Sequence, residues 1–187
     1  MRMFRELGVS WGAEELAQHY SPNWYRVYRA SGLPRNLWAE ADRLWARAYK
    51  EESPRLLPGA RRVLRALGRE FDLGLVTSGN RRRVRRQLRE FGLAEKFDAC
   101  VCSEDAPRRK PHPAPLRLAL RILRAEPEEC VYIGDAAEDI EMARRAGVRA
   151  IAVLGPFPTH ERLRKARADL LIESIGEVTE SIAVARG

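Results

Sequence analysis

The sequence predicts an α/β protein whose parallel sheet is covered by helices on both faces, preceded by a small all-helical unit. Two patterns support this prediction. Beyond residue 55, short apolar segments alternate with helical segments of about ten residues, an order typical of parallel sheets. Residues 1–54 show helix signals, no strand pattern, and all four tryptophans. The 187 residues, 45% of them hydrophobic, suffice for one ordinary domain with a small subdomain.

The first 54 residues are expected to form a small helical domain. Glycine, serine and proline interrupt its apolar pattern at short intervals, so each helix is short. The stretch 53–59, with two prolines and a glycine, then separates this domain from the rest, and we place the domains at 1–54 and 55–187. The expected helices cover residues 3–7, 12–20, 23–30 and 36–50.

Residues 55–187 are expected to form the α/β domain. Its apolar segments are short and bounded by turn residues, which favours buried parallel strands. Because helices connect them, the carboxyl ends of the strands should meet at one edge of the sheet, where α/β folds bind ligands. The expected strands cover residues 73–76, 99–102, 131–133, 150–154 and 170–172, and the expected helices cover 60–67, 81–91, 115–123, 139–146, 161–167 and a last segment from 176.

Composition bears on the location of the protein. No apolar run approaches the roughly 18 residues of a membrane span, and the N-terminal residues lack the apolar region of a secretion signal. Three cysteines, Cys100, Cys102 and Cys130, form an odd set in apolar, strand-like surroundings. We interpret them as buried, reduced thiols of a cytoplasmic protein, because a zinc site would need a second pair of ligands beside Cys100 and Cys102.

The net charge of +8 comes from arginine. Four of the 34 basic residues are lysines, which leaves 30 arginines, and six of these fall between residues 81 and 89. Such a segment could bind nucleic acid, but a solvated helix face is the preferred interpretation. Because cations oppose the dipole in the first turn of a helix, an anion bound nearby would also favour this arrangement.

The segment around Asp135 and Asp139 carries the strongest chemical signal. Both carboxylates follow the apolar segment 131–133 and Gly134, where a helix begins. A spacing of four residues puts them on one side of a turn, so their charges repel unless a cation binds. Mg²⁺ suits this position because it accepts one or two carboxylates and completes its coordination with water and phosphate oxygens. The alternative is an acidic helix N-cap without a metal, in which Asp135 caps the helix and Asp139 is solvated.

Two further segments are suited to a phosphate. Thr77, Ser78 and Gly79 follow the strand 73–76 at the start of a helix. Hydroxyls and free amides bind anions there, although Ser and Asn are also common N-caps. Lys110 precedes three prolines at alternate positions, so its loop is stiff. A lysine held between a hydroxyl loop and a carboxylate loop is a candidate phosphate clamp.

In order and spacing, Thr77-Ser78-Gly79, Lys110-Pro111 and Gly134-Asp135-x-x-x-Asp139 resemble the second, third and fourth motifs of the haloacid dehalogenase (HAD) superfamily of hydrolases. The chain is most similar to the phosphoglycolate-phosphatase-like branch, with 1–54 as a helical cap and 55–187 as a Rossmann-like core. The resemblance implies a Mg²⁺-dependent phosphatase of a small phosphorylated metabolite. It also implies that Lys110 and Thr77 are catalytic, that Thr77, Ser78, Gly79 and Lys110 bind the phosphoryl group, and that Asp135 and Asp139 hold Mg²⁺.

The chain departs from this family at one point. The complete family uses an Asp-x-Asp motif on its first strand, whose first aspartate forms an aspartyl-phosphate and whose second protonates the leaving group. No Asp-x-Asp occurs in the 187 residues, and the aspartates before Thr77 are Asp42 and Asp72. We therefore expect a truncated chain that is inactive as given. The alternative is a pseudoenzyme that binds a phosphorylated ligand or a protein partner. The sequence does not indicate the substrate.

The resemblance also implies where the absent strand belongs. In the family's sheet the first strand lies at the centre, here between segments 73–76 and 131–133. Its absence would leave two strand edges with unpaired backbone groups, which are costly when buried. We expect the incomplete sheet to favour strand donation by another chain, or self-association, over a stable monomer.

Overall fold

A computed structural model describes residues 2–51, 54–156 and 160–185. The chain divides into two compact units, Met1–Arg55 and Leu56–Gly187. The sequence had placed this boundary after residue 54. Each unit has an apolar core of its own.

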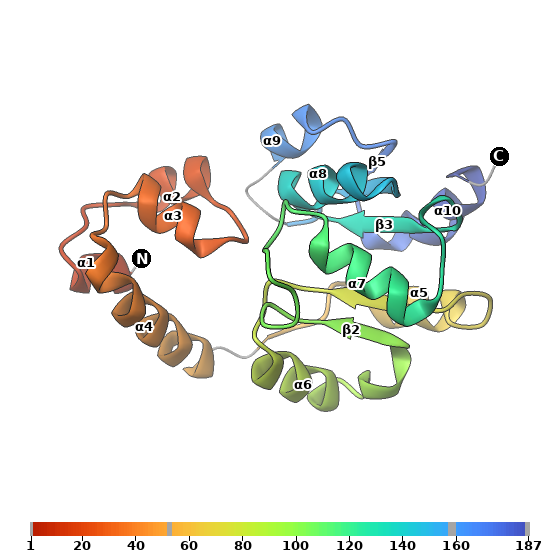
Figure 1. The fold of residues 1–187 in the computed structure, drawn as a ribbon, viewed down its shortest axis with the longest axis horizontal. Helices are drawn as coiled ribbons and strands as arrows, with labels where there is room; N and C mark the ends of the chain where they lie inside the picture. Colours follow the sequence, from red (N-terminus) through yellow and green to blue (C-terminus); the bar gives the residue numbers. More distant parts are fainter. Residues whose placement is uncertain (1, 52–53, 157–159, 186–187) are drawn as a thin grey trace. The chain divides into compact units, whose positions relative to one another are not determined.

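The first unit is all-helical, as its sequence predicts, and its core is aromatic. Phe4 and Tyr28 are buried, and the ring centroids of Trp24 and Trp45 lie 4.1 Å apart. The Tyr28 hydroxyl donates to Asp42 Oδ1 (3.0 Å), and burial together with this carboxylate raises the pKa of Tyr28. The elements are α1 (Arg2–Glu6), α2 (Ala13–His19), α3 (Trp24–Ala30), η1 (Arg35–Leu37) and α4 (Trp38–Glu51) (Figure 1).

The second unit alternates helices and strands. All five expected strands are present, with ends that differ from the prediction by at most one residue. The elements are α5 (Ala60–Leu67), β1 (Gly74–Val76), α6 (Arg81–Glu90), η2 (Ala94–Lys96), β2 (Ala99–Val101), α7 (Ala114–Leu123), η3 (Pro127–Glu129), β3 (Val131–Gly134), α8 (Ala137–Ala146), β4 (Arg149–Val153), α9 (His160–Lys165), β5 (Leu170–Ile172), η4 (Ile175–Glu177) and α10 (Val178–Ala185).

The strands form two parallel sheets, where the sequence had suggested one. β1 pairs with β2, and β3, β4 and β5 form the other sheet in that order. Among the described residues, β1 and β3 are therefore each paired on one side only. In Figure 1 the yellow β1 arrow lies between β2 and β3, so that β1 and β3 face each other in this view. That a further strand belongs between them remains a prediction.

Helices cover both faces and join the two sheets. The alternation along β4 directs Ile151 and Val153 into a cluster with α5 and α10, and Ala150 and Ala152 into a cluster with α7 and α8. The second cluster also contains Val76 of β1, and α7 contacts β1, β2 and α8 (Figure 1). Side-chain packing thus holds the two sheets together where no backbone ladder is described.

Two remaining expectations concern the membrane and the cysteines. None of the helices within the described ranges is both long and apolar enough to cross a membrane. All three cysteines are free, but the expectation that all are buried is wrong: Cys102 is 3% exposed, Cys130 is half-buried and Cys100 is exposed. Cys100 is exposed because it faces a cavity beside β2.

Candidate active site

The loop after β1 begins with Thr77 and ends at the first turn of α6. The Thr77 hydroxyl accepts a hydrogen bond from the Gly79 amide (3.0 Å), and the helix is capped by Asn80, whose Oδ1 accepts from the Arg83 amide (2.9 Å). A Cβ atom on Gly79 would lie 2.9 Å from Val84 Cγ2, so the loop needs glycine there. Asn80 provides the cap, and the Arg81 amide donates to the Glu104 carboxylate (3.2 Å). The hydroxyls of Thr77 and Ser78 are therefore the groups in this loop that are suited to an anion.

Lys110 lies at the centre of the site. Its side chain is buried, and its Nζ donates to the Val76 carbonyl (2.9 Å), to the Tyr132 hydroxyl (2.8 Å) and to Asp139 Oδ1 (2.8 Å). The Thr77 amide donates to the Val101 carbonyl on β2. Because the C=O and N–H groups of one peptide unit point in opposite directions, the Val76 carbonyl points away from β2 and can accept from Lys110. The lysine therefore links the end of one sheet to the loop that follows the other.

The carboxylate loop between β3 and α8 is closely packed. Asp139 Oδ2 accepts from the amides of Asp135 (3.3 Å) and Ala136 (3.2 Å), while its Oδ1 faces Lys110. Gly134 is required because a Cβ atom there would lie 2.4 Å from Asp139 Cβ. The alternative in which Asp135 caps the helix and Asp139 is solvated differs from the structure: the N-cap residue of α8 is Ala136, and Asp139 is buried and accepts from amides at the start of the helix.

Burial governs the charges at this site. Burial disfavours the charged form of Lys110, but Tyr132 and Asp139 outweigh this effect and the pKa of Lys110 lies above its usual value. Burial, with the Asp139 charge as a second cause, raises the pKa of Asp135 to about 6. Lys110 is therefore charged at neutral pH, and Asp135 is a carboxylate whose ionisation is costly without a cation.

The carboxylate loop fits a hard cation such as Mg²⁺. In the described part of the chain no group of three or more His, Cys, Asp or Glu residues could hold a metal, but Mg²⁺ needs only one or two carboxylates. Asp139 is already engaged by Lys110 and by two amides, so Asp135, with its raised pKa, is the principal candidate ligand.

The sequence prediction missed Tyr132, which it had treated as an apolar strand residue. The Tyr132 hydroxyl accepts a hydrogen bond from Lys110. It lies 3.3 Å from the Val76 carbonyl and 3.4 Å from Asp139 Oδ1, and it can donate a hydrogen bond to either of these oxygens. Burial, and then the Asp139 charge, raise the pKa of Tyr132. A lone tyrosine in an aliphatic strand, two residues before Gly134, was the available signal.

The structure brings together some of the predicted site residues and not others. Lys110 and Asp139 are in contact, and Asp135 is tied to Asp139 through its amide. Within the described ranges no hydrogen bond joins the hydroxyls of Thr77 or Ser78 to Lys110, and the connection passes through the Val76 carbonyl. The Lys110 side chain therefore links the loop that contains Thr77 to the carboxylate loop.

The arginines of α6 are mostly solvated. Arg85 and Arg89 are exposed, and Arg81 pairs with Asp105, whose carboxylate raises the pKa of Arg81. These contacts agree with the preferred interpretation of the segment as a solvated helix face.

The family model of haloacid dehalogenase-like hydrolases matches residues 1–153. The chain belongs to this family. Its relatives among the HAD-like hydrolases include a PpaX-type protein of Caldanaerobacter subterraneus subsp. tengcongensis, which is 31% identical over 180 residues, a match covering 95% of this chain and 82% of that protein. The pyrophosphatase PpaX of Bacillus pumilus is 34% identical over 110 residues, a match covering 59% of this chain and 51% of the relative.

Solved structures confirm the HAD-type α/β fold. A predicted phosphoglycolate phosphatase from Haemophilus somnus 129PT superimposes with a TM-score of 0.82 at 18% identity, covering 97% of this chain and 87% of the other. CbbY from Rhodobacter sphaeroides, solved in complex with phosphate, superimposes with a TM-score of 0.74 at 26% identity, covering 95% and 85%. The predicted resemblance to HAD-like hydrolases is confirmed, and the chain shares its fold with a predicted phosphoglycolate phosphatase.

Proposed function

We propose that this chain is the substrate- and metal-binding part of a Mg²⁺-dependent phosphatase that acts on a small phosphorylated metabolite. The position of Lys110 is the observation that supports this best. Its buried Nζ bonds the carbonyl that precedes Thr77 and, at the same time, Asp139 of the carboxylate loop. One cation thereby joins a loop suited to a phosphate to a loop suited to a metal. The first unit would act as the cap and the second as the core, in the cytoplasm, where free thiols persist.

The phosphoryl group would bind between Thr77 and Lys110. Thr77, Ser78 and Gly79 lie at the N-terminal end of α6, where backbone amides and the helix dipole favour anions. Gly79 lacks a side chain that would cover these amides. Lys110 supplies a positive charge that remains protonated, because its pKa lies above the usual value. These groups would bind and orient the phosphoryl oxygens.

Mg²⁺ would be held by Asp135, with Asp139 beside it. When bound, the ion supplies positive charge to the phosphoryl oxygens and relieves the cost of ionising Asp135. Asp139 would keep Lys110 in place through its ion pair of 2.8 Å. Tyr132 positions the same lysine through its hydroxyl, which lies 3.4 Å from Asp139 Oδ1.

Turnover requires a nucleophile that these 187 residues do not supply as an Asp-x-Asp motif. We therefore expect the chain as given to bind phosphate-bearing ligands without hydrolysing them. The same observation favours a second candidate function, a pseudoenzyme that binds a phosphorylated ligand or a protein partner. An in-frame apolar segment ending in Asp-x-Asp, encoded upstream of Met1, would favour the hydrolase, and a stop codon immediately before Met1 would favour the pseudoenzyme.

Binding and turnover can be measured on the same protein. Isothermal titration with inorganic phosphate and Mg²⁺ should detect binding, and Lys110→Met should abolish it. Lys165→Met is the matched control, because Lys165 is exposed and pairs only with Glu161 among the described residues. Equal binding by the wild type and Lys110→Met would contradict the proposed site, provided that circular dichroism shows both to be folded.

Para-nitrophenyl phosphate with Mg²⁺ tests the turnover part. We expect no hydrolysis above a buffer blank. Hydrolysis that Asp135→Ala removes would show that a nucleophile is present that the sequence did not reveal.

A further inference from the structure

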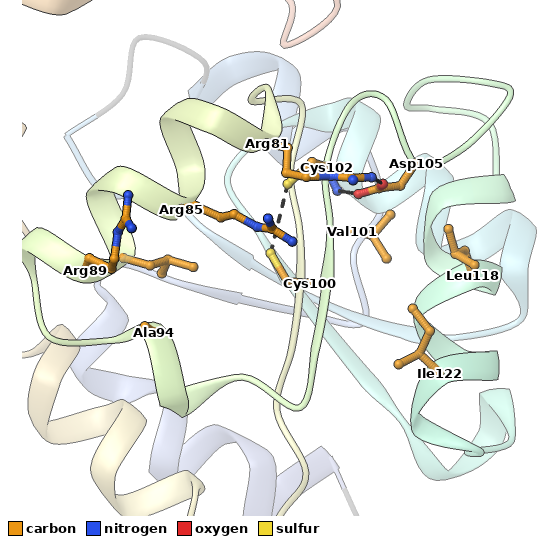
Figure 2. Close-up of a pocket in the computed structure, with 11 residues that line it drawn as sticks. Arg81, Arg85, Arg89, Ala94, Cys100, Val101, Cys102, Asp105, Leu118 and Ile122 are labelled. Carbon is orange, nitrogen blue, oxygen red and sulfur yellow. Dashed lines mark hydrogen bonds and ion pairs between the residues drawn. The ribbon is translucent and has the colours of Figure 1, made fainter.

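A cavity of about 580 Å³ lies beside β2, between α6 and α7. Its lining includes none of the residues assigned to the candidate active site. Helix α6 contributes arginines, among them Arg85 and Arg89, and α7 contributes the apolar side chains of Leu118 and Ile122 (Figure 2). Strand β2 contributes two thiols.

Cys100 and Cys102 place these thiols on the same face of the strand. Cys100 is the middle residue of β2 and Cys102 follows its last residue, and alternate residues of a strand point to the same side. Their Sγ atoms lie 4.0 Å apart, as the dashed line between them marks in Figure 2. Both residues line the cavity, but Cys100 is exposed and Cys102 is 3% exposed, so a ligand that enters the cavity meets the Cys100 thiol first.

The spacing suits a bridging metal better than a disulfide. Residues two apart in an extended chain have Cα atoms about 6.4–6.8 Å apart, at the upper end of the range of about 4.4–6.8 Å that a disulfide accepts. Two metal–sulfur bonds of about 2.3 Å, the zinc–thiolate length, place the sulfurs about 4.6 Å apart in the linear arrangement that a metal with two thiolate ligands prefers. The present Sγ–Sγ distance of 4.0 Å is about 0.6 Å shorter, a difference that rotation of the two cysteine side chains can supply.

We propose that Cys100 and Cys102 bind one Cu(I) ion. Cu(I) is soft, prefers thiolates and is satisfied by two of them. Zn²⁺ in a structural site needs four ligands, and the described ranges contain no cluster of three or more His, Cys, Asp or Glu residues. Asp105 is not a third ligand, because its carboxylate accepts from the Cys102 amide (2.7 Å) and pairs with Arg81.

Two of the arginines that line the cavity favour the metal-loaded form. Binding converts two thiols and Cu(I) into a bis-thiolate complex with one net negative charge and releases two protons, with no change of oxidation state. Arg85 and Arg89 line the cavity, are exposed, and form no ion pair with any residue that the structure describes. Their charges oppose a bare cation and stabilise the anionic complex. Without metal, burial first, then Cys100 and the charges of Asp105 and Glu104, raise the pKa of Cys102 to about 12, so that thiol is protonated and the metal must displace its proton.

Anaerobic titration of the reduced protein with Cu(I), in competition with a chromogenic Cu(I) chelator, tests the site. We expect one tightly bound ion per chain and an ultraviolet thiolate-to-copper band. Cys100→Ser and Cys102→Ser should each weaken binding on the order of 100-fold or more, since losing even an outer-shell partner of a metal costs about 10–100-fold. Cys130→Ser is the matched control and should bind as the wild type does.

Three results would overturn the proposal. One is a number of bound Cu(I) ions per chain that depends on the total number of cysteines, so that Cys130→Ser lowers it as well. Another is unchanged affinity in either serine variant. The third is Zn²⁺ binding as tight as that of Cu(I). The role of charge has its own arm: Arg85→Gln combined with Arg89→Gln should weaken Cu(I) binding several-fold, whereas Arg82→Gln, on the same helix but outside the cavity lining, should not.

Discussion

Replacing Asp135 by asparagine should stabilise the α/β unit at neutral pH in the absence of divalent cations. Burial, together with the Asp139 charge, raises the pKa of Asp135 from 3.8 to about 6. Each pKa unit corresponds to about 1.4 kcal/mol, so ionised Asp135 lowers the free energy of unfolding by up to about 3 kcal/mol. Asparagine keeps the size of the side chain and removes this cost.

The raised pKa sets the direction of the pH dependence. The folded state holds the Asp135 proton more tightly than the unfolded state does. The stability contributed by this group is therefore complete below pH 3.8 and is lost as the pH rises through about 6. Asp135→Asn should lack this decline.

Urea unfolding in EDTA, followed by far-ultraviolet circular dichroism at about pH 5 and pH 7.5, measures the effect on either side of that pKa. All four tryptophans lie in residues 1–54, so tryptophan fluorescence reports separately on the helical unit and should not change. Asp72→Asn is the matched control, because Asp72 is exposed. An Asp135→Asn protein no more stable than the wild type at pH 7.5 would refute the reasoning.

Three further predictions concern the same sheet edge. Lys110→Met should lower the free energy of unfolding by about 3–5 kcal/mol, because it leaves the buried Asp139 carboxylate unpaired, and urea unfolding should show no such loss for Lys165→Met. Gly134→Ala should cost about 1–3 kcal/mol by the same measurement, since its Cβ would lie 2.4 Å from Asp139 Cβ; an unaffected variant would contradict the contact. Light scattering after size exclusion should show self-association, and a monodisperse 21.3 kDa monomer with a cooperative melt would show that the strand edges close unaided.

The sequence predicted those features that depend on local pattern. Short apolar runs between helices predicted all five strands, because strand positions depend on the local hydrophobic pattern and on the turn residues that flank it. Lys110 and Asp139 were selected from motif spacing, and they form an ion pair of 2.8 Å.

Features set by side-chain geometry could not be predicted in the same way. The sequence assigned Asp139 to Mg²⁺, and its ion pair with Lys110 depends on which carboxylate oxygen faces the lysine. Tyr132 counts as apolar in a strand pattern, and only the fold shows its hydroxyl beside Lys110. Cys100 is exposed because a cavity lies beside β2, and the hydrophobic pattern of a strand does not indicate which elements pack against that strand.

The division into two sheets affects how the site can respond to a ligand. The Thr77 loop extends from one sheet and the Asp135 loop from the other, and backbone ladders fix distances only within each sheet. Between them, Lys110 acts as a tether from the Val76 carbonyl to Asp139. An anion bound at this lysine would contact a group that reaches both loops, so its binding would act on the Thr77 loop and on the Asp135 loop at the same time.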